Sequence, residues 1–229
     1  MTRIPTVLCA ALLAVAATAS CGGDPSARST SQGDDGAWIE LALAAGGQPA
    51  RLPVSVSGIV VERASFFVRD MRLVADHGRD DDQLRVSERL VELQDGGWRV
   101  HLPDAPPGLY SRLRARIERP DHDDDRGDDR GDRSRRASFS ITGRTPEGTP
   151  FALTGEDDFE LDLRAGDGAE LAPGMSLTAT VLLDVGQWWT GVQPSAATGG
   201  DKAEELLERL AKNIAKSATL TLRDGTAAQ

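Results

Sequence analysis

The chain has 229 residues, with 36 aspartates and glutamates against 26 lysines and arginines, and a formal net charge of −10. Nucleic-acid-binding proteins present basic patches, so this balance argues against a nucleic-acid partner. It also argues against direct docking on anionic lipid headgroups. Roughly 190 residues follow the N-terminal segment, which is enough for one domain with a packed core.

The N-terminal segment has the pattern of a secretory signal peptide. Arg3 precedes an apolar run over residues 7–19, and small residues follow this run. A basic start, a short apolar stretch and small residues before a cleavage site are typical of export signals. The run is too short for a membrane-spanning helix, which needs about 20 apolar residues. We therefore predict a signal peptide over residues 1–20.

The end of this segment, Ala19-Ser20-Cys21-Gly22, resembles the lipobox of bacterial lipoproteins, with Thr18 where that family usually has leucine. The resemblance implies that Cys21 becomes the new N-terminus and carries acyl chains such as palmitate. Two or more chains anchor a protein stably to a membrane. Gly22, in place of the aspartate that retains many such proteins at the inner membrane, favours the outer membrane. Both the cell membrane and the outer membrane stay open, as do the periplasmic and the exterior side.

The alternative is a plain secretory peptide that is cut near Ala19 and leaves Cys21 as a free thiol. The only other cysteine, Cys9, lies in the segment that is removed. The mature chain then has no internal disulfide, although an exported protein could form one. Its stability must come from a packed core.

Residues 21–36 are predicted to form the lipidated cysteine and a flexible stalk, because Gly, Ser and Asp dominate and no apolar periodicity is present. Residues 37–194 alternate apolar and polar side chains, which is typical of half-buried strands. The candidate strands are residues 38–43, 54–61, 64–75, 84–93, 98–102, 110–118, 137–142, 151–154, 159–163 and 175–183. Strands at this spacing without helices between them predict a mainly β fold, an antiparallel β-sandwich.

Three details of this pattern can be checked against a structure. Residues 64–75 place Phe67, Met71 and Leu73 on one face and Phe66, Val68 and Val74 on the other. Asp95-Gly96-Gly97 predicts a hairpin turn, since its residues tolerate positive φ. Residues 110–118 point Leu113, Ala115 and Ile117 inward and Arg112, Arg114 and Arg116 outward.

Residues 195–229 are predicted to form a linker, an amphipathic helix and a short tail. Asp201 is a candidate N-cap, and Glu204 completes the spacing of a capping box. The apolar positions Ala203, Leu206, Leu207, Leu210 and Ile214 share one face. We expect this helix to cover an open end of the sandwich; a partner-binding or dimerising helix is the alternative. Leu220 and Leu222 indicate a short final strand.

The adjacent pair Trp188-Trp189 allows two interpretations. Covered by the C-terminal helix, both rings belong to the core. Left exposed, they would offer a stacking surface for a sugar or a peptide.

Two acidic segments, residues 76–82 and 121–136, are the candidate metal sites. In the second, four aspartates fall at offsets 1, 3, 5 and 12, as in an EF-hand calcium loop, but Arg126 stands where that loop needs glycine. The segment also repeats Asp-Asp-Arg-Gly, which predicts a solvated, disordered loop. Copper or zinc would need the two segments to meet, so that their histidines act together. The candidate ligands are His77, Asp80, Asp121, His122, Asp123, Asp125 and Asp132.

No nucleophile elbow, zinc-protease motif, phosphate loop or dinucleotide fingerprint is present in the sequence. We therefore predict a protein that is not an enzyme and has no cofactor other than possible Ca²⁺. A binding or structural module of the cell envelope, with an envelope protein or a glycan as partner, is the favoured function. The alternative is a Ca²⁺- or copper-binding envelope protein that uses the acidic segments.

The segment Pro106-Pro107-Gly108-Leu109-Tyr110 resembles the turn that begins a strand in transthyretin-like sandwich domains. Together with the ending at residues 183–188, it looks like bacterial lipoproteins that carry an Ig-like or transthyretin-like sandwich domain of unknown function. Residues 66–74 are similar to a strand of periplasmic copper-associated proteins of the methanobactin-partner type, whose cysteines are absent here. These resemblances imply a fold rather than a function.

Overall fold

The structure is a computed structural model that describes residues 36–76, 84–87, 89–93, 97–120, 137–194 and 201–225. All of them belong to one compact unit, Asp34–Gln229. The described residues exclude the predicted signal peptide, most of the stalk and the linker at 195–200. They also exclude residues 77–83 and 121–136, which contain the candidate metal ligands.

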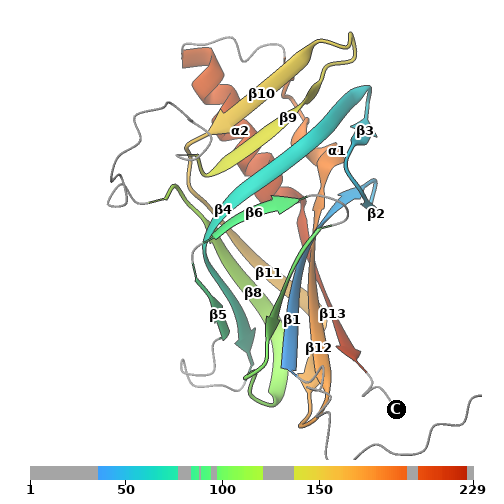
Figure 1. The fold of residues 1–229 in the computed structure, drawn as a ribbon, viewed down its shortest axis with the longest axis vertical. Helices are drawn as coiled ribbons and strands as arrows, with labels where there is room; N and C mark the ends of the chain where they lie inside the picture. The colour runs from blue at the N-terminus through green and yellow to red at the C-terminus, as the bar shows by residue number, and fades with distance from the viewer. Residues whose placement is uncertain are drawn as a thin grey trace, which may run out of the picture. The chain divides into compact units, whose positions relative to one another are not determined.

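Two β-sheets form the unit (Figure 1). The first has the order β13 (Ala218–Gly225), β12 (Ser176–Asp184), β1 (Gly36–Ala45) and β2 (Gln48–Ala50), and β7 (Trp98–Leu102) also pairs with β1. In the second sheet, each strand pairs with the next in the series β10 (Pro150–Gly155), β9 (Phe139–Arg144), β4 (Ile59–Ala75), β8 (Gly108–Ile117) and β11 (Phe159–Leu171). Three short strands also pair with β4: β3 (Val54–Val56), β5 (Leu84–Val86) and β6 (Arg89–Leu93). Both sheets contribute to one apolar core, so the predicted mainly β sandwich is confirmed. One pairing departs from the antiparallel pattern, because β1 and β12 run parallel.

Strand β4 is the spine of the second sheet. The amide of Phe67 donates to the carbonyl of Ser138 (2.8 Å), and its carbonyl accepts from the amide of Glu118 (3.1 Å). The N–H and C=O of one strand residue point to the same side. Strands β8 and β9 therefore lie end to end along one edge of β4, with β8 beside its second half and β9 beside its first. Strands β6, β3 and β5 occupy the opposite edge.

A bulge in β4 corrects the predicted faces of this strand. The pairing register shifts between Val68 and Asp70. As a result Phe66, Val68, Met71 and Leu73 are all buried, whereas Phe67 is only partly buried. The prediction that divided these residues between two faces was wrong, because one extra residue in a strand moves all later side chains to the other face.

Two turn predictions were also wrong. Residues 54–61 form two strands rather than one, since Ser57 (φ 51°) and Gly58 (φ 82°) make a two-residue hairpin that sets Val56 opposite Ile59. The expected hairpin at Asp95-Gly96-Gly97 is a connection between sheets, because β6 pairs with β4 and β7 pairs with β1. Asp95 and Gly96 lie outside the described residues. Gly97 is packed so tightly that an added Cβ would lie 2.6 Å from the Leu41 carbonyl.

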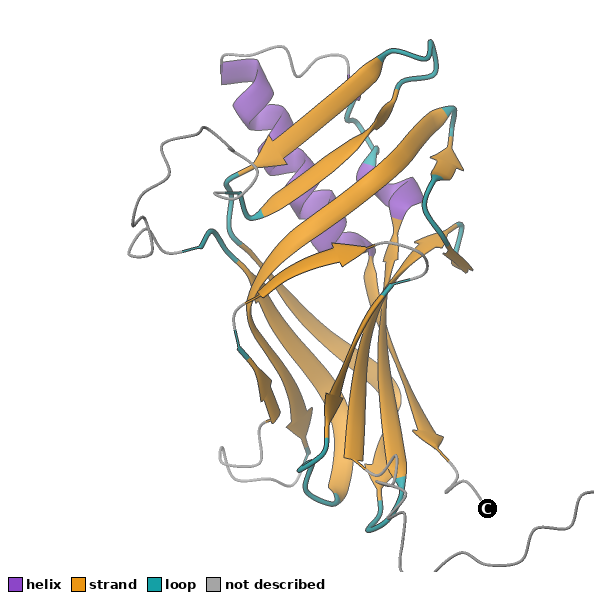
Figure 2. Ribbon diagram, in the orientation of Figure 1, coloured by secondary structure: helices purple, strands orange, loops and turns teal. Residues whose placement is uncertain are grey.

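Two helices cover one end of the sandwich, α1 (Val185–Trp188) and α2 (Asp201–Ser217) (Figure 2). Helix α2 contacts α1, β10, β11 and β12, and it buries Leu210, Ala211 and Ile214. The predicted covering helix and the final strand after it, β13, are confirmed. The side chain of Asp201 is not described, so its role as N-cap stays a prediction.

Both tryptophans of the adjacent pair are core residues. Trp188 is fully buried, packs edge-on against Phe66, and donates from Nε1 to the Ser217 hydroxyl of α2 (3.0 Å). Trp189 is 8% exposed and packs against Phe151 with ring centroids 5.6 Å apart. The alternative of an exposed stacking surface was wrong.

Candidate functional site

Every residue that the sequence marks as a candidate site lies outside the described part of the chain: Cys21, His77, Asp80, Asp121, His122, Asp123, Asp125 and Asp132. Whether the two acidic segments meet is therefore a prediction that stays open. Within the described ranges, no group of three or more His, Cys, Asp or Glu side chains could hold a metal ion. Among the same residues, no helix is long and apolar enough to cross a membrane.

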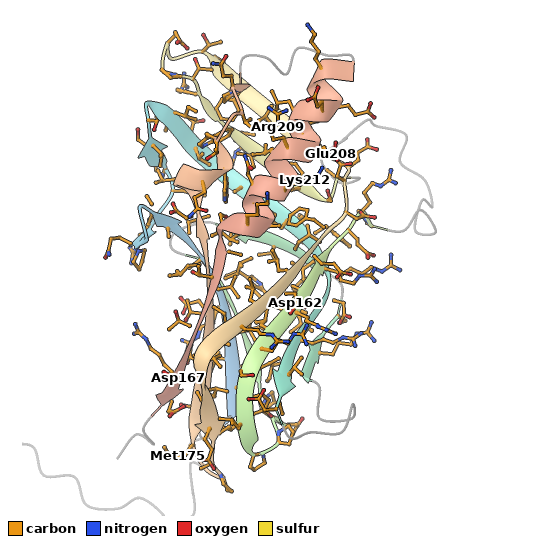
Figure 3. All side chains as sticks on the ribbon, turned by 180° about the vertical axis from the view of Figure 1, so that it is seen from behind. Asp162, Asp167, Met175, Glu208, Arg209 and Lys212 are labelled. Carbon is orange, nitrogen blue, oxygen red and sulfur yellow. The ribbon has the colours of Figure 1, made fainter. Side chains whose placement is uncertain are left out.

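The most distinctive described surface is the outer side of β4, β5, β8 and β11 (Figure 3). We call it the arginine face. Its arginines are Arg72, Arg85, Arg112, Arg114, Arg116 and Arg164, and its carboxylates are Asp70, Glu118, Glu160 and Asp162. Positive groups thus outnumber negative ones here, although the whole chain carries a net charge of −10.

Strand geometry places these groups on one face. On β8 the alternate residues Leu113, Ala115 and Ile117 are buried, which turns the arginines between them outward, as predicted. On β11 the buried Leu161 does the same for Glu160 and Asp162. On β4 the bulge is responsible, because it sends Met71 into the core and Asp70 and Arg72 to the outer side.

The pairing register arranges the charges in rows across the strands. One row is Asp70, Arg116 and Glu160, and the next is Arg72, Arg114 and Asp162. In the second row, Arg72 stands directly opposite Arg114 and, on its other side, opposite Arg85. Like charges in directly opposite positions destabilise a sheet. The interleaved carboxylates offset part of this cost.

Asp70 is the most buried of these carboxylates, 8% exposed. It contacts Arg72 Nη2 at 2.5 Å and accepts a hydrogen bond from Arg85 Nε at 3.0 Å. Burial opposes its ionisation, but the hydrogen bonds and charges of Arg72 and Arg85 outweigh burial, so the pKa of Asp70 is lowered.

The other carboxylates are held in the same way. Asp162 accepts two hydrogen bonds from Arg112, which lower the pKa of Asp162, and lies 3.7 Å from Arg114 Nε. Arg116 Nε lies 3.0 Å from Glu118 and 3.1 Å from Glu160. The lowered pKa values of Asp70 and Asp162 keep both ionised at neutral pH, which suits electrostatic binding and not proton donation.

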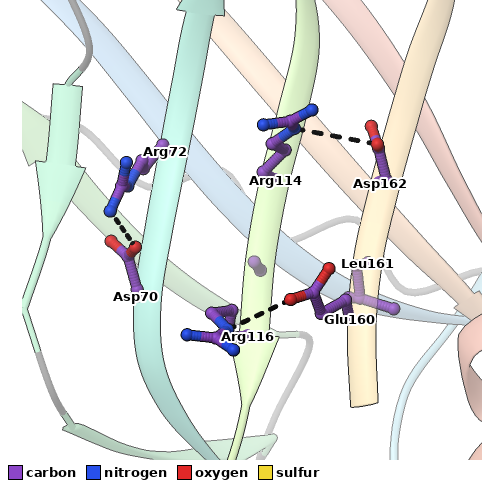
Figure 4. Close-up of a pocket in the computed structure, with 8 residues that line it drawn as sticks. Asp70, Arg72, Arg114, Arg116, Glu160, Leu161 and Asp162 are labelled. Carbon is purple, nitrogen blue, oxygen red and sulfur yellow. Dashed lines mark ion pairs between the residues drawn. The ribbon is translucent and has the colours of Figure 1, made fainter.

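A hollow of about 300 Å³ opens between these rows (Figure 4). It is lined by Asp70, Arg72, Arg114, Ala115, Arg116, Glu160, Leu161 and Asp162. Three arginines from two neighbouring strands therefore share one concave surface.

A second hollow of about 400 Å³ lies on the first sheet, with Glu40, Arg51 and Arg223 among apolar and threonine side chains. Near it on the same sheet, His101 stacks on Trp38 with ring centroids 4.2 Å apart, and the Arg99 guanidinium lies 4.1 Å from the Trp38 ring. His101 is thus engaged in a ring stack.

No known family model matches the chain, and no curated protein matches it. A similar solved structure is that of MbnP from Methylosinus trichosporium, with 13% sequence identity and a TM-score of 0.44, covering 72% of this chain and 80% of that chain. A similarity at this level carries no inference about ligand or activity.

The arginine face was only half visible in the sequence. The alternation of β8 predicted three outward arginines. Asp162, which accepts hydrogen bonds from Arg112, lies 50 residues after it in the chain, and Asp70, which stands opposite Arg116, lies 46 residues before it. Only the pairing register brings these residues together.

Proposed function

We propose that this protein is a lipid-anchored, extracytoplasmic, non-enzymatic binding module that binds its ligand through the arginine face. The observation that carries the proposal is the surplus of arginines over carboxylates on one sheet surface of a strongly acidic chain. Local charge of this kind attracts and orients an oppositely charged partner.

The electrostatics of the face support binding over catalysis. A general acid or base works best with a pKa near the working pH. Arginine neighbours lower the pKa of Asp70 and of Asp162 instead, away from that range. The ion pairs also hold the arginine side chains in place, and a preorganised surface loses less entropy when a ligand binds.

The place where the stalk would join supports presentation at a membrane. The amide of Gly36, the first residue of β1, donates to the carbonyl of Met175 just before β12 (3.2 Å), and Gly36 packs against Leu102 at the end of β7. Strand β8 begins at Gly108, close to the end of β7, so the arginine face occupies the half of the sandwich that contains Gly36, the first residue of β1 (Figure 1).

Metabolic labelling with palmitate tests the anchor. Wild type is expected to take up label and to sediment with membranes, whereas Cys21→Ala loses both properties. Cys9→Ala is the matched control, because Cys9 lies in the predicted signal peptide and its replacement should leave labelling unchanged. Label retained by Cys21→Ala would overturn the lipid anchor.

Capture of ligands from the cell envelope tests the binding surface. The double variant Arg114→Ala/Arg116→Ala should lose material that wild type retains. Arg223→Ala, which removes an exposed arginine from the other sheet, should retain it. Equal capture by all three proteins would contradict binding through the arginine face.

A further inference from the structure

We infer that the arginine face binds a phosphate ester, with its tetrahedral oxyanion in the hollow lined by Arg72, Arg114 and Arg116. This inference deepens the proposed function and rests on it, since it names the ligand class for the same surface.

The geometry brings three guanidinium groups to one concave surface. Arg72 and Arg114 are directly opposite each other on β4 and β8. Arg116 is the next outward residue along β8, about 7 Å further on. The hollow they line has a volume of about 300 Å³, within the range of small-molecule sites. It has room for a phosphate group and part of the group to which it is esterified.

The ion pairs leave outward donors unused. A guanidinium carries five N–H donors in a fixed fork. The closest carboxylate contacts of Arg114 and Arg116 are made by Nε, the nitrogen nearest the backbone. Each of these side chains is 55% exposed, so their Nη groups extend towards solvent. For Arg114 the contact of 3.7 Å is longer than a hydrogen bond. Its guanidinium is positioned by Asp162 and still available.

The charge arrangement favours a phosphate over a carboxylate ligand. Arg72 stands directly opposite Arg114 and, on its other side, opposite Arg85, and Asp70 and Asp162 offset only part of this repulsion between like charges. A phosphate monoester brings a charge of about −1.5 to −2 and three acceptor oxygens, enough for several guanidinium groups at once. A carboxylate brings one charge and two oxygens. Three carboxylates also line the hollow, Asp70 from β4 and Glu160 and Asp162 from β11. The phosphate therefore contacts the arginines of β8, which lie between them.

Calorimetric titration of the purified full chain in a nonionic detergent tests the site, with inorganic phosphate as the first probe. Wild type should release or absorb heat on binding, and added salt should weaken the affinity. Arg114→Ala should weaken it about tenfold or more, because it removes a charge-assisted hydrogen bond. Arg223→Ala is the control for charge alone, since it removes the same charge from the other sheet, and should bind like wild type.

Two further arms separate the sources of the phosphate group. Glycerol 3-phosphate represents a soluble ester, and phosphatidylcholine vesicles containing phosphatidic acid represent a lipid headgroup. Binding of both probes, each weakened by Arg114→Ala, assigns the site to lipid headgroups. Binding of glycerol 3-phosphate alone assigns it to soluble esters.

The absence of phosphate binding to wild type, or an equal loss in Arg114→Ala and Arg223→Ala, would overturn the inference. Thermal unfolding of each variant shows whether it is folded, and Arg116→Gln provides a second variant that keeps a polar side chain. If phosphate fails to bind while envelope capture still depends on the arginine face, the ligand class is wrong and the binding module stands. If capture is independent of the face as well, both are wrong.

Discussion

The two halves of the second sheet expose different side chains on their outer faces. Both present an outer face to solvent along the same strand, β4. In the first half a row across the strands consists of Ser65, Ser140 and Thr154. In the second half the corresponding row is Arg72, Arg114 and Asp162. Small hydroxyl side chains thus occupy part of the exposed surface of the first half, where Arg63 donates to Thr142 in the next row. The second half carries a denser set of arginines and carboxylates.

The inner faces differ as well. Helix α2 contacts β10 in the first half, whereas β8 and β11 of the second half contact β13 of the first sheet, with α2 also touching β11. The first half is therefore distinguished by its helical cover, and the second by the charged side chains on its outer face. Changes in the first half should act on stability, and changes in the second half on binding.

The largest effect on stability is expected from Trp188→Ala in α1, which packs against the first half. This change removes a fully buried ring that packs on Phe66, and it leaves the Ser217 hydroxyl without its donor. The free energy of unfolding should fall by about 3–5 kcal/mol, measured by urea denaturation. Leu90→Ala is the control, because Leu90 is an exposed apolar residue on β6, and it should change stability little. A loss below about 1 kcal/mol for Trp188→Ala would mean that the helical cover contributes little to the fold.

A smaller effect is expected from Asp70→Asn in the second half. The change removes the charge that Arg72 and Arg85 share and should cost about 1–3 kcal/mol at neutral pH. Since the pKa of Asp70 is lowered in the folded state, its contribution is present above its unfolded pKa, about pH 4. It is lost as the pH falls through the lowered folded value.

Unfolding temperatures measured from pH 7 down to pH 2 check this sign. The difference between wild type and Asp70→Asn should shrink on acidification. Asp162→Asn is the control, and its effect should stay below about 1 kcal/mol because Asp162 is a largely exposed ion-pair partner. A difference for Asp70→Asn that grows at low pH would contradict the proposed pairing.

Asp157, at the boundary between the two halves, should show the opposite sign. Burial raises its pKa, and the neighbouring charges of Glu208 and Asp158 raise it further. A raised carboxyl pKa costs the folded state stability as the pH rises above the unfolded value. Asp157→Asn should therefore raise the unfolding temperature at pH 7, by less than Asp70→Asn lowers it, and the gain should vanish near pH 3. Asp158→Asn should give a smaller gain, because it removes only one of the charges that raise the pKa of Asp157 and leaves that carboxyl buried.

The comparison of the two halves also shows which features a sequence reveals. The alternation of β8 and the apolar face of α2 are local patterns. The first predicted its buried residues correctly, and the second included the buried Leu210 and Ile214 but missed the buried Ala211. The faces of β4 were wrong because the bulge at Arg69 has no residue signature of its own. The pairing of β6 and β7 with different sheets depends on contacts distant in sequence, which an Asp-Gly-Gly turn cannot specify. The arginine face depends on register in the same way.

The smallest effect is expected where β8 and β9 meet, on replacing residues 121–136 by a short glycine linker. Glu118 and Ser138 both hydrogen-bond to Phe67, so the ends of this insertion are already held beside each other. A shorter connection loses less entropy on closure, by about 0.6 kcal/mol for each halving of its length. The variant should unfold cooperatively, at the same temperature as wild type or slightly above it.

The same variant tests the metal alternative. We expect equal unfolding temperatures for wild type in EDTA, Ca²⁺ and Cu²⁺. A metal ion present at 100 times its Kd would add about 2.7 kcal/mol to the stability, a change that this measurement detects readily. A rise with Ca²⁺ or Cu²⁺ that the deletion abolishes would place a metal site at the candidate ligands between Asp121 and Asp132. A rise that survives the deletion would point to His77 and Asp80 instead. Loss of cooperative unfolding in the variant would mean that the junction on Phe67 needs the insertion, and that the two halves of the sheet are joined through it.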